Sequence, residues 1–189
     1  MADFLISYRL LGPKEGGYAN DPKDRGGETW KGTSRVSNPD WGGWHLIDEA
    51  KVRQDFPECL NQFPALESAV QSLYLEKYWN PIRGNDLPQE IADELFEVGV
   101  NADPLRAIRF LQNSINILNR NQKLYPDVEA DGKMGNDTLG AVLACIQHRG
   151  IPLLLKVMNV SQGCHYLNIL LSKPEQEQFA LSWFNRVEV

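Results

Sequence analysis

The chain has no long apolar run and little cysteine. Its 189 residues include three cysteines, an odd number without CxxC spacing, which excludes a disulfide framework and a zinc knuckle. No run of about 18 apolar residues is present, so no transmembrane helix is expected. The N-terminus does not resemble a signal peptide, because Asp3 stands where a basic region belongs and Arg9 interrupts the apolar residues. We expect synthesis in the cytoplasm without a signal peptide, and no membrane insertion.

The cysteines and histidines also lack the spacing of a metal site. Cys145 and Cys164 could form a bridge in an oxidising compartment, but buried free thiols are favoured. The three histidines are too scattered for a zinc peptidase motif. Residues 127–132 resemble the start of a calcium loop, but Thr138 stands where a glutamate is needed. We therefore predict no metal and no cofactor.

An excess of positive charge is absent too. Lys and Arg number 19 against 25 Asp and Glu, a formal net charge of −6. The protein as a whole therefore has no positive electrostatic field that would attract nucleic acid or an anionic bilayer. The charge is uneven, since residues 1–35 sum to +1 and residues 36–189 to −7. Residues 86–103 hold six acids and no base.

The residues that are present predict a folded, mainly helical protein. Hydrophobic residues make up 42% and five are Trp, enough for one large domain or two small ones. Residues 16–44 hold seven Gly, two Pro and three Trp, typical of a loop or small hairpin. Helical spacing or capping signals predict helices over 3–11 (ending or bending at Gly12-Pro13), 47–56, 65–79, 88–100, 104–121 (Asp103 as N-cap), 137–149 (capped by Asn136 or Asp137), 151–171 (one or two helices) and 175–186.

Acidic residues are densest near the N-terminus. Glu15 stands at the end of an apolar helix, Asp21 and Asp24 follow on a glycine-flanked turn, and Thr29 lies five residues beyond Asp24. Glycoside hydrolysis needs a carboxylic acid of raised pKa to protonate the leaving oxygen, and a second carboxylate or an oriented water. The alternative is a helix C-cap and an ordinary turn whose acids are merely solvated.

This segment resembles the signature of glycoside hydrolase family 108. The matching residues, 15–32, are Glu-Gly-Gly-Tyr-x-Asn-Asp-Pro-x-Asp-x-Gly-Gly-x-Thr-x-x-Gly. The family contains peptidoglycan-cleaving muramidases of phage endolysins and exported bacterial proteins, within the lysozyme superfamily. Residues 116–127 and 131–139 resemble the peptidoglycan-binding module usually found behind that domain.

The resemblance implies a mainly α (α+β lysozyme-like) fold. We expect a helical bilobal domain with a small Gly-rich loop or β-hairpin region after the catalytic helix. Residues 1–85 would form the catalytic lobe, and residues 86–189 a helical peptidoglycan-binding-like lobe packed with the first as one unit. A lobe of 85 Gly-rich residues alone has too little core to be independent.

The resemblance also assigns roles. Glu15 matches the catalytic Glu and would be the general acid. Asp24 and Thr29 would hold the attacking water or stabilise the oxocarbenium ion, with Asp21 as the rival second carboxylate. Trp30, Trp41, Trp44 and Trp79 are more often core residues than sugar platforms, and Trp30, inside the motif, is the one expected to line the cleft. Asn101, in a turn between helices, is expected at the far wall of that cleft. The full substrate-binding set is Tyr18, Asn20, Asp21, Gly27, Trp30 and Asn101.

The expected function is an N-acetylmuramidase that cleaves the β-1,4 bond between N-acetylmuramic acid and N-acetylglucosamine. The alternative is a non-catalytic peptidoglycan-binding or secretion-assisting protein on the same scaffold. The protein is expected to be a monomer. Peptidoglycan is its expected partner, and a protein inhibitor or immunity protein is a second possible partner. The enzyme would act in the periplasm or cell wall after holin release, lysis or dedicated secretion; a phage endolysin and a bacterial effector both fit.

Overall fold

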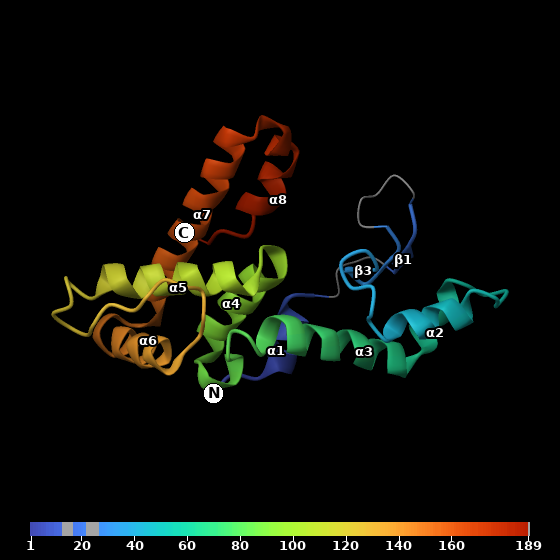
Figure 1. The fold of residues 1–189 in the computed structure, drawn as a ribbon, viewed down its shortest axis with the longest axis horizontal. Helices are drawn as coiled ribbons and strands as arrows, with labels where there is room; N and C mark the ends of the chain where they lie inside the picture. The colour runs from blue at the N-terminus through green and yellow to red at the C-terminus, as the bar shows by residue number, and fades with distance from the viewer. Residues whose placement is uncertain (13–16, 22–26, 189) are drawn as a thin grey trace. The chain divides into compact units, whose positions relative to one another are not determined.

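The computed structural model describes residues 1–12, 17–21 and 27–188 and is drawn in Figure 1. The chain forms two compact units. The N-terminal unit is Phe4–Asn80, and the C-terminal unit joins Met1–Asp3 to Pro81–Val189. Helices dominate both units, and a small antiparallel sheet occurs in the first. The predicted mainly α fold of lysozyme-like α+β type is confirmed.

The N-terminal unit combines short helices with three two-residue strands. The sheet order is β1-β2-β3, and both pairs are antiparallel. The small hairpin region predicted within residues 16–44 is thus present. Its elements are α1 (Phe4–Leu10), β1 (Tyr18–Ala19), β2 (Thr29–Trp30), β3 (Thr33–Ser34), α2 (Gly43–Ala50), η1 (Glu58–Gln62), α3 (Pro64–Tyr74) and the π-helical η2 (Leu75–Trp79).

Turn residues explain where these elements stop. Helix α1 ends just before Gly12, which has φ +69°, as the Gly-Pro pair predicted. Strands β2 and β3 are joined by Lys31 and Gly32, with φ of +44° and +80°. Two consecutive positive φ values match the twist of a two-residue hairpin, so the strands pair directly on either side of this turn.

Large apolar side chains form the core of the N-terminal unit. Phe4 and Tyr8 of α1 make ring contacts with Trp79 and Tyr74, so α1 packs on the segment from α3 to η2. The predicted helix over 47–56 instead spans Gly43–Ala50, and its N-terminal turn buries Trp44. The buried apolar residues are Trp30, Trp44, Ile47, Ala50, Cys59, Leu60, Leu66, Val70, Tyr74 and Trp79.

In the C-terminal unit, α5 is the central helix and contacts α4, α6 and α7. Its buried face includes Ile108, Leu111 and Ile115, the stripe that its periodicity predicted. Residues 151–172 form a single helix, and the terminal helix expected over 175–186 is split into η4 and a short α8. The elements are η3 (Gly84–Asp86), α4 (Gln89–Asn101), α5 (Pro104–Leu118), α6 (Asn136–Arg149), α7 (Ile151–Ser172), η4 (Pro174–Phe179) and α8 (Ala180–Phe184).

One predicted helix cap is confirmed and another is wrong. The Asp103 side chain accepts a hydrogen bond from the Arg106 backbone N–H at 2.7 Å, with Pro104 in the first turn of α5. Helix α6, however, has Gly135 at its N-cap and no side-chain cap. The side chain of Asn136 is used elsewhere, because its Oδ1 accepts a hydrogen bond from Arg83 at 2.8 Å.

The connection between α5 and α6 is fixed by one buried glutamine. The Gln112 amide accepts from the Gly132 backbone N–H at 2.9 Å and donates to Asp131 Oδ1 at 3.0 Å and to Thr138 Oγ1 at 3.2 Å. Gly132 has φ +82°, and a Cβ there would lie 2.5 Å from Leu105 Cγ. These contacts hold Asp131 and Gly132 in a turn before α6.

Within the described ranges, no group of three or more His, Cys, Asp or Glu residues could hold a metal ion. All three cysteines are free; Cys59 and Cys145 are buried, whereas Cys164 is exposed, contrary to the expectation that all would be buried. No single helix in the same ranges is long and apolar enough to cross a membrane, and α6 and α7 meet that test only together, across a 116° bend.

Candidate active site

A pocket of about 440 Å³ lies in the N-terminal unit where α1 ends. Its lining comes from α1, from the β2–β3 turn and from α3, and includes Tyr8, Gly12, Lys31, Glu67 and Gln71. Gly12 is the last described residue before the family motif, and Gly17, the next described one, accepts a backbone hydrogen bond from Lys31. Gly12 therefore lines this pocket, and Gly17 is hydrogen-bonded to Lys31, which also lines it.

Glu67 is the carboxylate of this pocket. Lys31 Nζ lies 2.8 Å from Glu67 Oε2, while the Tyr8 hydroxyl and the Gln71 amide each donate to Oε1 at 3.3 Å. Burial raises the pKa of Glu67, but Lys31 and the other donors outweigh burial and hold it below the ordinary 4.5. Glu67 is therefore ionised at neutral pH and can accept hydrogen bonds from a ligand's hydroxyl groups.

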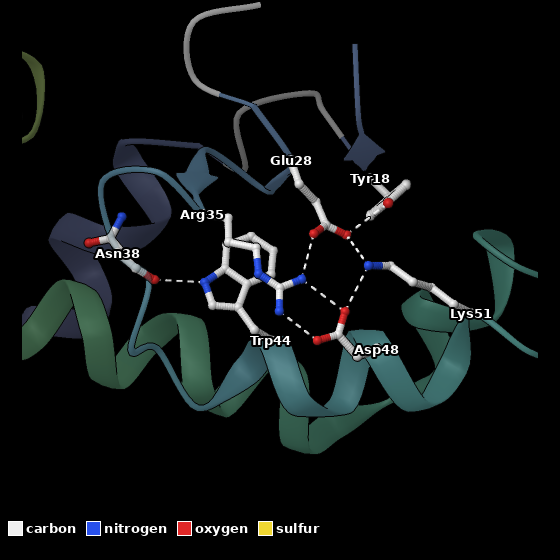
Figure 2. Close-up of polar contacts among 7 residues, drawn as sticks. All are labelled: Tyr18, Glu28, Arg35, Asn38, Trp44, Asp48 and Lys51. Carbon is white, nitrogen blue, oxygen red and sulfur yellow. Dashed lines mark hydrogen bonds and ion pairs between the residues drawn. The ribbon is translucent and has the colours of Figure 1, made fainter. Parts of the chain in front are cut away.

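A second carboxylate, Glu28, lies directly before β2 and joins the hairpin to α2 (Figure 2). Its oxygens accept from Arg35 at 2.6 Å, from Lys51 at 2.7 Å and from the Tyr18 hydroxyl at 2.8 Å. Arg35 also forms a two-pronged contact with Asp48, with distances of 2.8 and 2.5 Å. The Arg35 guanidinium stacks over Trp44, whose Nε1 donates to the Asn38 carbonyl at 2.7 Å.

This network keeps its acids charged. Burial raises the pKa of Glu28, but hydrogen bonds from Lys51, Arg35 and Tyr18 together lower it below 4.5. Hydrogen bonds from Arg35 and Lys51 likewise hold the pKa of Asp48 far below its usual range. A general acid requires the opposite shift. Glu28 and Glu67 are therefore suited to holding structure and binding hydroxyls, and unsuited to donating a proton.

The structure describes most, but not all, of the residues to which the sequence assigned roles. Glu15 and Asp24 lie outside the described residues. Thr29 is half-buried on the central strand β2, where it pairs with Ala19 and Ser34. The other described residues of the predicted site lie on or next to the sheet. Tyr18 is on β1, and its hydroxyl donates to Glu28. Asn20 and Asp21 are exposed directly after β1, and Gly27, with φ +62°, precedes β2.

Two expected substrate contacts lie elsewhere than predicted. Trp30 is 2% exposed, so its ring is buried and is not presented as a sugar platform on a cleft. Asn101 is not in a turn. It is the last residue of α4, and its amide donates to the Glu97 carbonyl at 2.8 Å and to the Glu97 carboxylate at 2.7 Å.

Sequence reasoning missed Lys31, Glu67 and the partners of Glu28. Lys31 and Glu67 are 36 residues apart and meet only because the β2–β3 turn packs on α3. Glu28 stands inside the family motif, at a position the motif leaves undefined. Its closeness to Tyr18 could have been inferred from a hairpin, but Arg35, Asp48 and Lys51 join it through tertiary packing.

Comparisons with known proteins show which families the two regions of the chain match. Residues 9–102 match the family model described as Glycosyl hydrolase 108, and residues 106–188 match the one described as Predicted Peptidoglycan domain. Both regions that the sequence analysis recognised are confirmed, and the first belongs to the glycosyl hydrolase 108 family. The protein is thus a glycoside hydrolase that acts on peptidoglycan, with cell wall as its place of action.

The solved structure of Brucella abortus SagA has a similar fold. It matches with a TM-score of 0.59 and 24% sequence identity, over 97% of this chain and 88% of that one. At this identity the likeness concerns the fold alone. No curated protein matches the chain.

Proposed function

We propose that the protein is an N-acetylmuramidase, which hydrolyses the β-1,4 bond from N-acetylmuramic acid to N-acetylglucosamine. The observation that carries the proposal is the pocket at the end of α1, whose lining includes Gly12 and also Lys31, which donates a backbone hydrogen bond to Gly17 of the family motif. A pocket containing one ionised carboxylate, an ammonium, an amide and two tyrosines suits a polyhydroxylated sugar with an N-acetyl group.

Glu15 is the proposed general acid. The acid must be protonated when substrate binds, and the pKa values of Glu28 and Glu67 are shifted in the wrong direction for that role. Glu15 also stands where the family signature has its catalytic glutamate, three residues after the pocket residue Gly12 in the sequence. Asp24 and Thr29 are proposed to position the water or stabilise the positive charge of the sugar ring.

The product ends identify the bond. Purified sacculi are digested and the soluble fragments analysed by mass spectrometry after borohydride reduction. Reduced muramic acid ends are expected. Reduced glucosamine ends would make the enzyme a glucosaminidase, and 1,6-anhydro ends a lytic transglycosylase, and either result would overturn the proposal.

Glu15→Gln tests the catalyst. The variant should lose at least about a hundredfold in activity, as expected for removal of a general acid, and keep the wild-type melting temperature. The variant should still sediment with sacculi. Release of fragments at the wild-type rate would remove Glu15 from the mechanism, whereas binding without release by the wild type itself would favour a non-catalytic binding protein.

A further inference from the structure

A second pocket of the N-terminal unit, of about 500 Å³, contains the half-buried Trp41. It lies between the segment 37–42 and α3, and we call it the Trp41 pocket. Around the indole it presents the exposed side chains of Asp40, Ser72 and Glu76. In the described part of the chain, no hydrogen bond engages the Ser72 hydroxyl or the two carboxylates.

Trp41 is held in place by three contacts. Its Nε1 donates to the Ala69 carbonyl at 3.1 Å. Its ring meets that of Trp44 edge-on, with centroids 5.1 Å apart and an angle of 87°. It also covers the backbone of Gly43 so closely that a Cβ there would lie 2.2 Å from the Trp41 ring. A ring fixed in this way loses no rotational freedom when a ligand binds.

The Trp41 pocket is separate from the pocket at α1. Both use α3, but Glu67 and Gln71 line one, whereas Ala69 and Leu73 line the other. At about 100° per residue, these two pairs point to opposite sides of the helix. The Trp41 pocket is therefore not a continuation of the first pocket around the same face.

We propose that the Trp41 pocket binds a neutral N-acetylated amino-sugar ring of the glycan strand. This inference rests on the proposed function, because it takes peptidoglycan as the substrate. The apolar face of a pyranose ring fits against an indole, and its hydroxyl and amide N–H groups can donate to Asp40 and Glu76. The same two carboxylates disfavour the anionic ends of the stem peptides, which selects the sugar.

The site would hold a second stretch of glycan while another stretch is cleaved. Binding at two places on one polymer raises the local concentration of bonds at the active site. The contribution should therefore be large on intact sacculi and small on short soluble fragments, which offer too few sugars to reach both places.

The test uses the full chain, ¹⁵N-labelled, with tetra-N-acetylchitotetraose as the neutral probe. The Trp41 indole N–H resonance, assigned by its loss in Trp41→Phe, should shift in a saturable manner. Ser72→Trp fills the pocket from an exposed position of α3 and should weaken this binding at least about tenfold. Ser68→Trp is the matched control, since Ser68 is exposed on the same helix and does not line the pocket.

The outcomes separate this inference from the proposed function. No shift of the Trp41 resonance in the wild type, an equal shift in Ser72→Trp, or a shift caused by a free stem peptide and not by the saccharide would each overturn it. Glu15→Gln, which removes hydrolysis, should leave the Trp41 shift unchanged. A protein that binds the saccharide at Trp41 but releases no muropeptides would contradict the muramidase and support the site.

Discussion

The ammonium of Lys31 lies 2.8 Å from the carboxylate of Glu67, and both side chains line the pocket at α1. Each of the two side chains is partly open to solvent, so their attraction alone contributes little to stability. Its proposed role is to hold a charged acceptor and a donor at a fixed spacing for a ligand.

Glu67→Gln tests this role. The amide keeps the size of the side chain but removes the charge that holds Lys31, so sugar binding should weaken and KM for soluble glycan fragments should rise about tenfold, with a smaller change in kcat. Steady-state kinetics measure both. Glu49→Gln on α2, which alters an exposed carboxylate outside the pocket, should match the wild type. An unchanged KM would show that Glu67 does not contact substrate.

Glu28→Gln should destabilise the N-terminal unit by about 2 kcal/mol, because a neutral amide with one acceptor oxygen replaces the carboxylate whose two oxygens accept from Arg35 and Lys51. Urea unfolding measures the loss. Asp55→Asn, in an exposed ion pair with Arg53, should change stability far less. Equal effects in the two variants would contradict a structural role for the network.

The same network predicts a loss of stability in acid. The pKa of Glu28 is lower in the folded chain than its ordinary 4.5, so its contribution is complete above that pH and is lost as the pH falls through the folded value. The difference in unfolding free energy between wild type and Glu28→Gln should therefore shrink below about pH 4.5. A difference that stays constant down to pH 3 would contradict this explanation.

Gly43→Ala tests how the Trp41 pocket is built. The new methyl group would occupy the space of the Trp41 ring and displace it, so affinity for tetra-N-acetylchitotetraose should fall although alanine favours the helix. Gly140→Ala in α6 is the control, because a Cβ there meets nothing within 4 Å and Gly140 does not line the Trp41 pocket. Titrations that match for the two variants would show that the position of the ring does not matter.

Asp103→Ala should cost about 1 kcal/mol, because the N-cap of α5 loses its hydrogen bond to the Arg106 N–H. Asp137→Ala should cost less, since Asp137 lies in the first turn of α6 without capping it. Thermal unfolding of the two variants gives the comparison, and a larger loss for Asp137→Ala would reverse the assignment of the caps.

Local signals predicted the helices of the C-terminal unit well. Asp103 and Pro104 mark the start of α5 because capping depends only on neighbouring residues. The same rule placed a side-chain cap at Asn136 or Asp137 and was wrong, since Arg83, distant in sequence, binds Asn136. Where a tertiary partner competes for the capping side chain, local chemistry does not determine the helix start.

The site was less predictable than the fold. A motif of residues 15–32 predicted the hairpin and the family, but it could not show that the ring of Trp30 is buried, because burial depends on which face of the sheet the rest of the unit covers. Nor could it place Glu67 beside Lys31, or Trp41 over Gly43, because those contacts depend on how α2 and α3 pack.

Gly132 limits how the connection before α6 can change by mutation. Any side chain at this position would meet the Leu105 side chain and carbonyl, and would add left-handed backbone strain of about 1–2 kcal/mol. Shortening Leu105 would relieve only part of the clash, because its carbonyl oxygen stays 2.8 Å from the new Cβ. A randomised library selected for folding should therefore retain glycine at position 132 even when Leu105 varies freely, so the two positions will not compensate for each other.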